Sequence, residues 1–207
     1  MTQTEGTELT ARERLRSETR PKHAELDALL GELRPFTSVE RYAIYLLGMR
    51  ELYARFGAAL DRCAELSEQS GRQQEMIEAI DRDLAACERL TPTELPSNGS
   101  AGASPSRDSG LPDSAAWGAA YVLEGSAMGA QMLVRSARER LPAAVTIEFL
   151  QALAGSGVGR FKNFCAAMES ADVDGDEAVA AAAAVFEHAI GWYRTRMNAA
   201  VLDAGEN

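Results

Sequence analysis

Cysteine and histidine are scarce in this chain of 207 residues, which contains three cysteines and two histidines. Cys63, Cys87 and Cys165 are odd in number and show no CxxC spacing, which argues against a disulfide scaffold and against a cysteine zinc site. Neither histidine has further cysteines or histidines beside it at the spacing of a zinc centre. We therefore expect three buried thiols in a protein of a reducing compartment.

The chain also lacks an excess of positive charge and any long uncharged run. It has 21 basic and 31 acidic residues, a net charge of −10, whereas a general nucleic-acid binder carries a basic surface. No uncharged run exceeds 12 residues, too short to cross a bilayer. The first residues show no signal-peptide pattern. We expect a cytoplasmic protein that binds neither nucleic acid nor a membrane.

Residues that favour β-strands are few. Val and Ile together number 14, against 37 Ala and 21 Leu, and Ala and Leu are the residues that lose least free energy in a helix. No segment alternates apolar and polar residues with period two. The sequence therefore predicts an all-α fold, and its length and 46% hydrophobic content suffice for one domain over residues 1–207.

Helical periodicity and capping signals predict seven helices. Thr10 and Glu13 form a capping-box pattern at the start of the first helix. Pro21 should kink or split that helix, and Gly31 should end it. The glycines of 155–157 should separate the fifth helix from the sixth. We expect helices at residues 10–31, 37–63, 72–90, 113–141, 145–153, 158–170 and 174–202.

Glycine, serine and proline gather in one segment near the middle of the chain. They make up 13 of the 23 residues from 92 to 114. Such a composition buries too little apolar surface to offset the entropy of ordering. We expect residues 92–112 to form an extended surface loop within one domain, and residues 1–8 to form a disordered tail.

His23 lies on the apolar face of the first predicted helix. Asp27 follows four residues later, where its carboxylate can accept from the imidazole Nδ1 and leave Nε2 free to bind a metal. Arg16, Arg20 and Lys22 form a positive cluster around it, which an anionic ligand near His23 would explain. The alternatives are a hydrogen-bonded core histidine and a solvated basic face.

Three glycines in the fourth predicted helix need an explanation. Gly118, Gly125 and Gly129 each cost about 1 kcal/mol relative to alanine in a helix interior. Glycines at this spacing allow two helices to pack closely. They also allow a flat ligand to lie directly against the backbone. The spacing alone does not separate these two interpretations.

Three motifs combine these features. Residues 15–27 read LRSETRPKHAELD, residues 121–129 read YVLEGSAMG, and residues 159–164 read GRFKNF. In this order, they resemble the heme oxygenase family, in particular the bacterial, biliverdin-producing branch that is often paired with phytochromes. The order of the predicted elements fits that family over nearly the whole chain.

The resemblance implies an all-α domain with heme between a proximal N-terminal helix and a kinked, glycine-rich distal helix. It also implies that His23 is the axial ligand of the heme iron, with Asp27 as the partner that orients it. Ser126 stands where many members carry Asp, and Ala130 where a second consecutive glycine is usual. The matching positions are Arg16, Arg20, His23, Asp27 and Lys162 for heme binding, and Gly125, Ser126 and Gly129 for catalysis on the distal helix.

The activity implied by the resemblance is oxidative opening of heme to biliverdin, carbon monoxide and iron. Heme would be both substrate and prosthetic group, and O2 would be the oxidant. Since the chain has no flavin or nicotinamide motif, a ferredoxin-type protein or a flavoprotein reductase would supply electrons. A bacterial phytochrome is a candidate acceptor of biliverdin. Basic residues that could dock an acidic donor are Arg16, Arg20, Lys22, Arg135, Arg138 and Arg140.

Two alternatives to an enzyme remain open from the sequence. One is a carrier or sensor that holds heme on the same fold without converting it. The other is a helical interaction protein, in which the glycines pack helices and His23 is a core residue. His188, near Phe186 and Trp192 in the last predicted helix, is expected to be a packed histidine rather than a second iron ligand.

Overall fold

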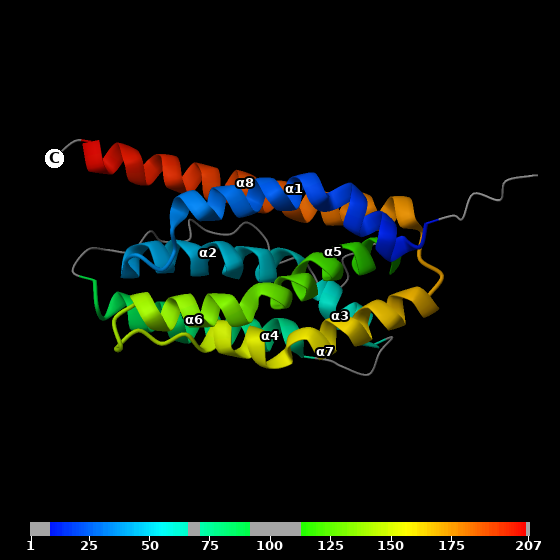
Figure 1. The fold of residues 1–207 in the computed structure, drawn as a ribbon, viewed down its shortest axis with the longest axis horizontal. Helices are drawn as coiled ribbons and strands as arrows, with labels where there is room; N and C mark the ends of the chain where they lie inside the picture. The colour runs from blue at the N-terminus through cyan, green and yellow to red at the C-terminus, as the bar shows by residue number, and fades with distance from the viewer. Residues whose placement is uncertain (1–8, 66–70, 92–112, 206–207) are drawn as a thin grey trace, which may run out of the picture.

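The computed structural model describes residues 9–65, 71–91 and 113–205, and every regular element in these ranges is a helix (Figure 1). The predicted all-α class is confirmed, whereas the predicted tail at 1–8 and loop at 92–112 lie outside the described residues. None of the described helices is long and apolar enough to cross a membrane. The elements are α1 (Ala11–Leu33), α2 (Val39–Phe56), α3 (Ala58–Glu65), α4 (Arg72–Glu88), α5 (Asp113–Gly125), the 3-10 helix η1 (Ser126–Gly129), α6 (Ala130–Arg140), α7 (Glu148–Ser170) and α8 (Gly175–Gly205).

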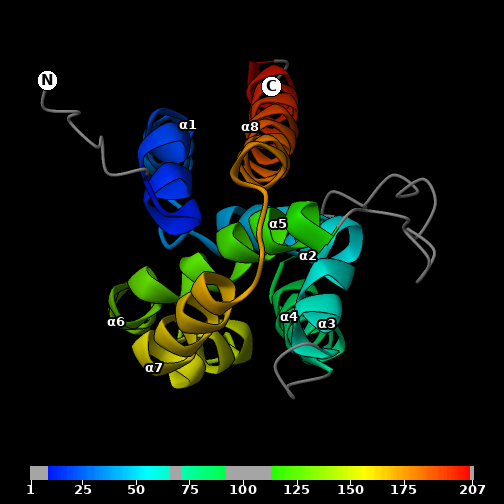
Figure 2. The ribbon, with the colours of Figure 1, turned by 90° about the vertical axis from the view of Figure 1, so that its right-hand side faces the viewer.

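The helices are arranged in three layers. Helices α1 and α8 lie side by side in the top layer, α2 and α5 lie beneath them, and α3, α4, α6 and α7 form the lowest layer (Figures 1 and 2). The largest fully buried side chains come from all three layers, so one core runs through the molecule. The apolar stripe of α2, which carries three tyrosines, lies in this core. Its buried members are Tyr42, Tyr45, Leu46, Met49, Leu52 and Tyr53.

Two glycines allow the closest helix contacts in the core. A Cβ atom on Gly118 would overlap the backbone carbonyl of Ala178, so α5 and α8 meet backbone to backbone there. A Cβ atom on Gly48 would overlap the ring of Tyr193. The Tyr193 hydroxyl donates a 2.9 Å hydrogen bond to the carbonyl of Tyr45. Gly118 and Gly48 are therefore packing residues.

Helix α1 is continuous through Pro21, where a kink or a split was predicted. Its capping box is present, since Glu13 N donates to the Thr10 hydroxyl (3.2 Å) and Thr10 N donates to the Glu13 carboxylate (3.0 Å). Pro21 lies inside the helix, which continues past Gly31 and ends at Arg34 in the left-handed region, at φ 50°. Buried side chains on both sides of the proline hold the helix on the core, and this packing outweighs the lost backbone hydrogen bond.

Two further helix boundaries differ from the prediction. The second predicted helix breaks into α2 and α3 at Gly57, where the carbonyl of Tyr53 accepts from both Gly57 N and Gln73 Nε2, each at 2.9 Å. The glycines of 155–157 do not separate two helices, because α7 runs through them. Buried residues such as Phe149 and Met168 anchor both halves of α7, so glycine weakens the helix without ending it.

The prediction of three buried thiols is confirmed, and it leads to a test of reactivity. Cys63, Cys87 and Cys165 are all buried and free of disulfides. Burial and the nearby Asp83 raise the pKa of the Cys87 thiol to about 12, and burial also raises the pKa of Cys165. Because the thiolate is the reactive form, we expect Ellman's reagent at pH 8 to react only slowly with native protein. Denatured protein should release three equivalents of thionitrobenzoate at once, one for each cysteine. Rapid reaction of the native protein would contradict the buried placement of the thiols.

Candidate functional site

The fourth predicted helix is broken into α5, η1 and α6. The break lies at the short 3-10 helix η1, with Gly125 just before it and Gly129 at its end. The Ser126 hydroxyl donates a 2.6 Å hydrogen bond back to the carbonyl of Leu123, a contact that often bends helices. The glycine-rich helix predicted for residues 113–141 is therefore distorted at Gly125 and Gly129.

The space around the glycines separates their two interpretations. A Cβ atom on Gly129 would have no neighbour within 4 Å, and one on Gly125 would only touch the ring of Phe161, at 3.7 Å. Beside them, Met128 and Met132 are 50% and 74% exposed, which is unusual for large apolar side chains. Unlike Gly118, neither glycine meets the backbone of another helix within the described residues, and a methyl group would fit at both positions.

Helix α1 carries a polar stripe with His23 at its centre. Arg16, Arg20, His23 and Asp27 follow each other at spacings of four, three and four residues, so they share one face. The His23 side chain is 62% exposed, and its Nδ1 lies 2.9 Å from Asp27 Oδ2. Its ring also contacts the edge of Phe186 in α8, with centroids 5.7 Å apart. His23 is thus not a core histidine.

The basic side chains of α1 fall into two groups. Arg12, Arg14 and Lys22 are engaged, since they pair with Glu169, Asp176 and Glu187 respectively. Arg16 and Arg20 are exposed and form no ion pair with any residue that the structure describes. The predicted cluster around His23 is therefore reduced to these two arginines, and both lie on the His23 stripe.

Side chains from three helices meet near Arg16. Burial raises the pKa of Tyr121 in α5, and the positive charges of Arg12 and Arg16 oppose that rise, which places both arginines within electrostatic reach of the phenol. Tyr121 contacts Phe161 of α7, with ring centroids 5.6 Å apart. Lys162 follows Phe161, is exposed, and has no ion-pair partner within the described ranges. Helices α1, α5 and α7 thus contribute to one end of the candidate site.

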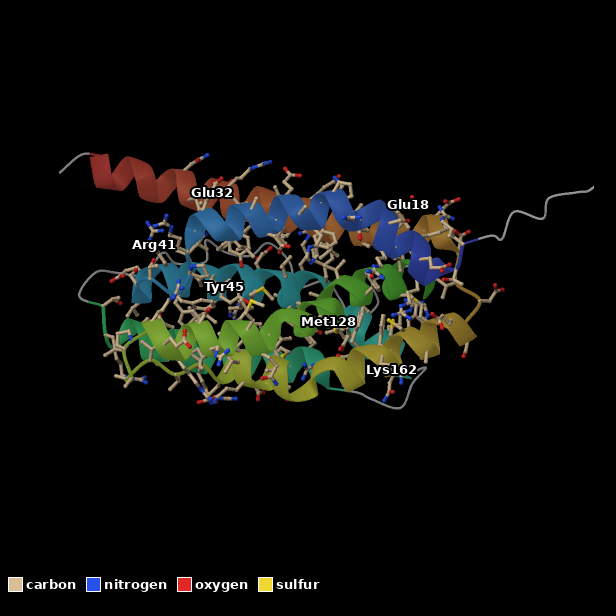
Figure 3. The ribbon with its side chains drawn as sticks, viewed as in Figure 1. Glu18, Glu32, Arg41, Tyr45, Met128 and Lys162 are labelled. Atoms are coloured by element: carbon tan, nitrogen blue, oxygen red, sulfur yellow. The ribbon has the colours of Figure 1, made fainter. Side chains whose placement is uncertain are left out.

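The figures place these elements around one region. Helix α1 lies above the run from α5 to α6 in both ribbon views (Figures 1 and 2). Met128 lies on this run beneath α1, and Lys162 lies on α7 further toward the end where α1 begins (Figure 3). The elements of the candidate site are therefore α1 with the His23 stripe, η1 beneath it, and α7, whose Phe161 lies beside Gly125.

Sequence reasoning missed a buried charge behind this site. Glu124 is only 5% exposed, and both of its carboxylate oxygens accept from Arg160 Nε at 2.9 Å. Tyr53 is buried beside this pair, and burial raises its pKa to about 12. The signal was present in the sequence, because Glu124 is the only charged residue between Asp113 and Arg135.

The other candidate residues have structural roles or stay on the surface. His188 is partly buried, with Nε2 3.0 Å from Glu51 and its ring against Phe56, which supports the prediction of a packed histidine. On α6, Arg135 pairs with Glu139 at 3.6 Å, whereas Arg138 and Arg140 are exposed. Over the described residues, no group of three or more His, Cys, Asp or Glu side chains could hold a metal ion.

Comparison with known proteins assigns no family to this chain. No family model matches it, and no curated protein matches it at a significant level. The resemblance to heme oxygenases therefore rests on the three sequence motifs.

Proposed function

We propose that this protein is a heme oxygenase, which opens heme with O2 and external electrons to biliverdin, carbon monoxide and iron. The observation that carries the proposal is the open space beside the backbone at Gly125 and Gly129, where an added Cβ atom would meet at most the ring of Phe161, on a helix that is distorted at these glycines. Two costly glycines without a packing role are explained by a flat ligand that lies against them.

The residues of the candidate site suit the chemistry of heme. The carboxylate of Asp27 beside Nδ1 of His23 fixes the ring so that Nε2 is available to iron. The exposed Arg16, Arg20 and Lys162 suit the two propionates, because guanidinium and ammonium groups bind carboxylates strongly. Bound heme would supply the iron at which O2 is activated, and it would itself be the substrate that is opened.

The protein's own contribution at the distal side comes mainly from its backbone. Without side chains at Gly125 and Gly129, the backbone lies open to a ligand. The Ser126 hydroxyl already donates to the carbonyl of Leu123, so toward a bound ligand it offers lone pairs rather than a proton. Protons would then reach the site through ordered water.

A heme carrier or sensor is the second candidate, and one observation favours it. Ser126 carries the only hydroxyl among residues 125–130, and this hydroxyl already donates its proton to the backbone carbonyl of Leu123. No side chain of this segment is therefore free to donate a proton. The two candidates share the same heme site and differ in turnover alone.

A hemin titration followed by reductant in air tests both candidates. For the enzyme, we expect a Soret band that saturates at one equivalent and then gives way to the broad red absorption of biliverdin. His23→Ala should weaken or shift the Soret band, because it removes the axial ligand. His188→Ala is the matched control, since it removes the other histidine without touching the His23 stripe.

The outcomes separate the candidates. Binding without conversion would favour the carrier or sensor. Absence of a Soret band in the unaltered protein would overturn both heme proposals and leave a helical interaction protein. Equal losses of the band in His23→Ala and His188→Ala would mean that the effect is one of stability, and His23 would no longer be assigned as the ligand.

A further inference from the structure

We propose that the buried Glu124–Arg160 ion pair is a positioning device that fixes the segment from Gly125 to Gly129, and with it the Ser126 hydroxyl, at the face proposed for heme. The inference rests on the proposed function for the identity of the ligand. The structural part of the inference, that the ion pair holds residues 125–129 in place, does not depend on any ligand. Glu124 and Arg160 act on the site through the backbone between them and are not themselves catalytic residues.

The pair lies directly behind the distorted segment. Glu124 is the residue before Gly125 at the end of α5, and Arg160 lies on α7. Arg160 Nε donates to both oxygens of Glu124 at 2.9 Å, which joins the two helices at this point. The next residue of α7, Phe161, is the only side chain among the described residues that a Cβ atom on Gly125 would meet.

Stability alone does not account for a charged pair at this position. Its side chains are 5% and 21% exposed, and burying two charges costs as much free energy as their attraction returns in many proteins. Apart from Ser114, which accepts a hydrogen bond from Asp174 N, the rest of α5 that faces the core is apolar, with Trp117, Ala120 and Leu123 buried. A buried pair of this kind contributes directional bonds that an apolar contact lacks, so it selects one geometry of the chain.

That geometry is the one that orients the Ser126 hydroxyl. Ser126 lies two residues beyond Glu124 and donates to the carbonyl of Leu123 at 2.6 Å, so both contacts lie in one turn of the chain. The buried phenol of Tyr53 lies beside Ser126, within the fields of Glu124 and Arg160. Release of Glu124 would free this turn to rotate.

Hydrogen exchange in the ligand-free protein tests the structural half. The double variant Glu124→Gln/Arg160→Gln removes both charges and so leaves no unpaired buried charge. We expect amide exchange of residues 125–130 to rise about tenfold, and that of residues 116–120 to change little. The matched control is Arg82→Gln/Glu148→Gln, which removes an exposed pair at 2.6 Å between α4 and α7 and should leave residues 125–130 unchanged.

Hemin conversion by the same variants tests the functional half. We expect the double variant to bind hemin with nearly unchanged affinity, since His23 is intact, and to convert it about tenfold more slowly. A uniform rise in exchange along α5, or unchanged conversion beside increased exchange, would overturn the proposal. If the double variant does not fold, Arg160→Lys keeps the charge, loses the two-oxygen contact and should give the same two changes. If the unaltered protein binds no hemin, the proposed function fails. Amide exchange of residues 125–130 would then still show whether the ion pair holds this segment in place.

Discussion

Replacing Gly118 with alanine is expected to lower the free energy of unfolding by at least about 3 kcal/mol. The added methyl group would overlap the backbone carbonyl of Ala178. Since backbone atoms cannot rotate away as a side chain can, α5 and α8 would have to separate along their contact. Chemical denaturation at equilibrium measures the change, and the midpoint should fall without a change of slope.

Replacing Gly129 with alanine is expected to raise the free energy of unfolding instead of lowering it. Apart from its chain neighbours, no atom of the described residues lies within 4 Å of the position that a Cβ would take, and the backbone at φ −94° and ψ −7° accepts alanine without strain. Alanine should therefore stabilise the protein by up to about 1 kcal/mol through its higher helix propensity. Gly31→Ala, at an equally open position in α1, is the matched control for propensity alone.

Hemin binding measured on Gly129→Ala and Gly31→Ala tests whether Gly129 borders the proposed ligand. Gly129→Ala should weaken hemin binding or conversion although it stabilises the fold, because its methyl group enters the proposed ligand space. Gly31→Ala should gain similar stability and leave hemin binding unchanged. A destabilised Gly129→Ala would show that this glycine packs a helix as Gly118 does, and the main support for a heme site would be lost.

The fold class and most helices could be predicted from the sequence because they depend on local signals. The capping box at Thr10 and the apolar stripe from Tyr42 to Tyr53 repeat patterns that any buried amphipathic helix shows. Gly31 and the glycines of 155–157 misled the prediction of helix ends, because glycine weakens a helix locally while distant contacts hold it. Propensity acts within one turn, whereas those contacts join residues far apart in the chain.

The candidate site was predictable to the extent that its residues share one helix. Arg16, Arg20, His23 and Asp27 fall on one face by spacing alone, and the short His23–Asp27 contact follows from their separation of four residues. The partner of Glu124 could not be found in this way, because Arg160 is 36 residues away. The ion pair between Lys22 and Glu187, which removes Lys22 from the predicted basic cluster, likewise depends on how α1 packs on α8.

Asp83→Ala is expected to cost about 3 to 5 kcal/mol of stability, an effect as large as that of Gly118→Ala. Asp83 is fully buried on α4. Its carboxylate accepts from the backbone N–H groups of Glu148 and Phe149, both at 2.9 Å, and from the Tyr42 hydroxyl at 3.2 Å. The first turn of α7 has no cap from its own side chains, so Asp83 supplies from another helix what a capping residue normally does.

Alanine at position 83 would leave two helix N–H groups and the phenol of Tyr42 buried without partners. The loss of stability therefore exceeds that of one hydrogen bond. Asp81→Ala is the matched control, because Asp81 lies on the same helix and pairs with Arg50 at 2.6 Å on the surface. It should cost about 0 to 1 kcal/mol. Equal losses in the two variants would contradict the capping role.

The Asp83 variant also separates stability from the proposed activity. Asp83 holds the first turn of α7, whereas Phe161 and Lys162 lie in the second half of that helix. Well below its lowered melting temperature, folded Asp83→Ala should therefore bind hemin as the unaltered protein does. A loss of hemin binding without unfolding would mean that the start of α7 positions the ligand as well, and the candidate site would then extend along the whole helix.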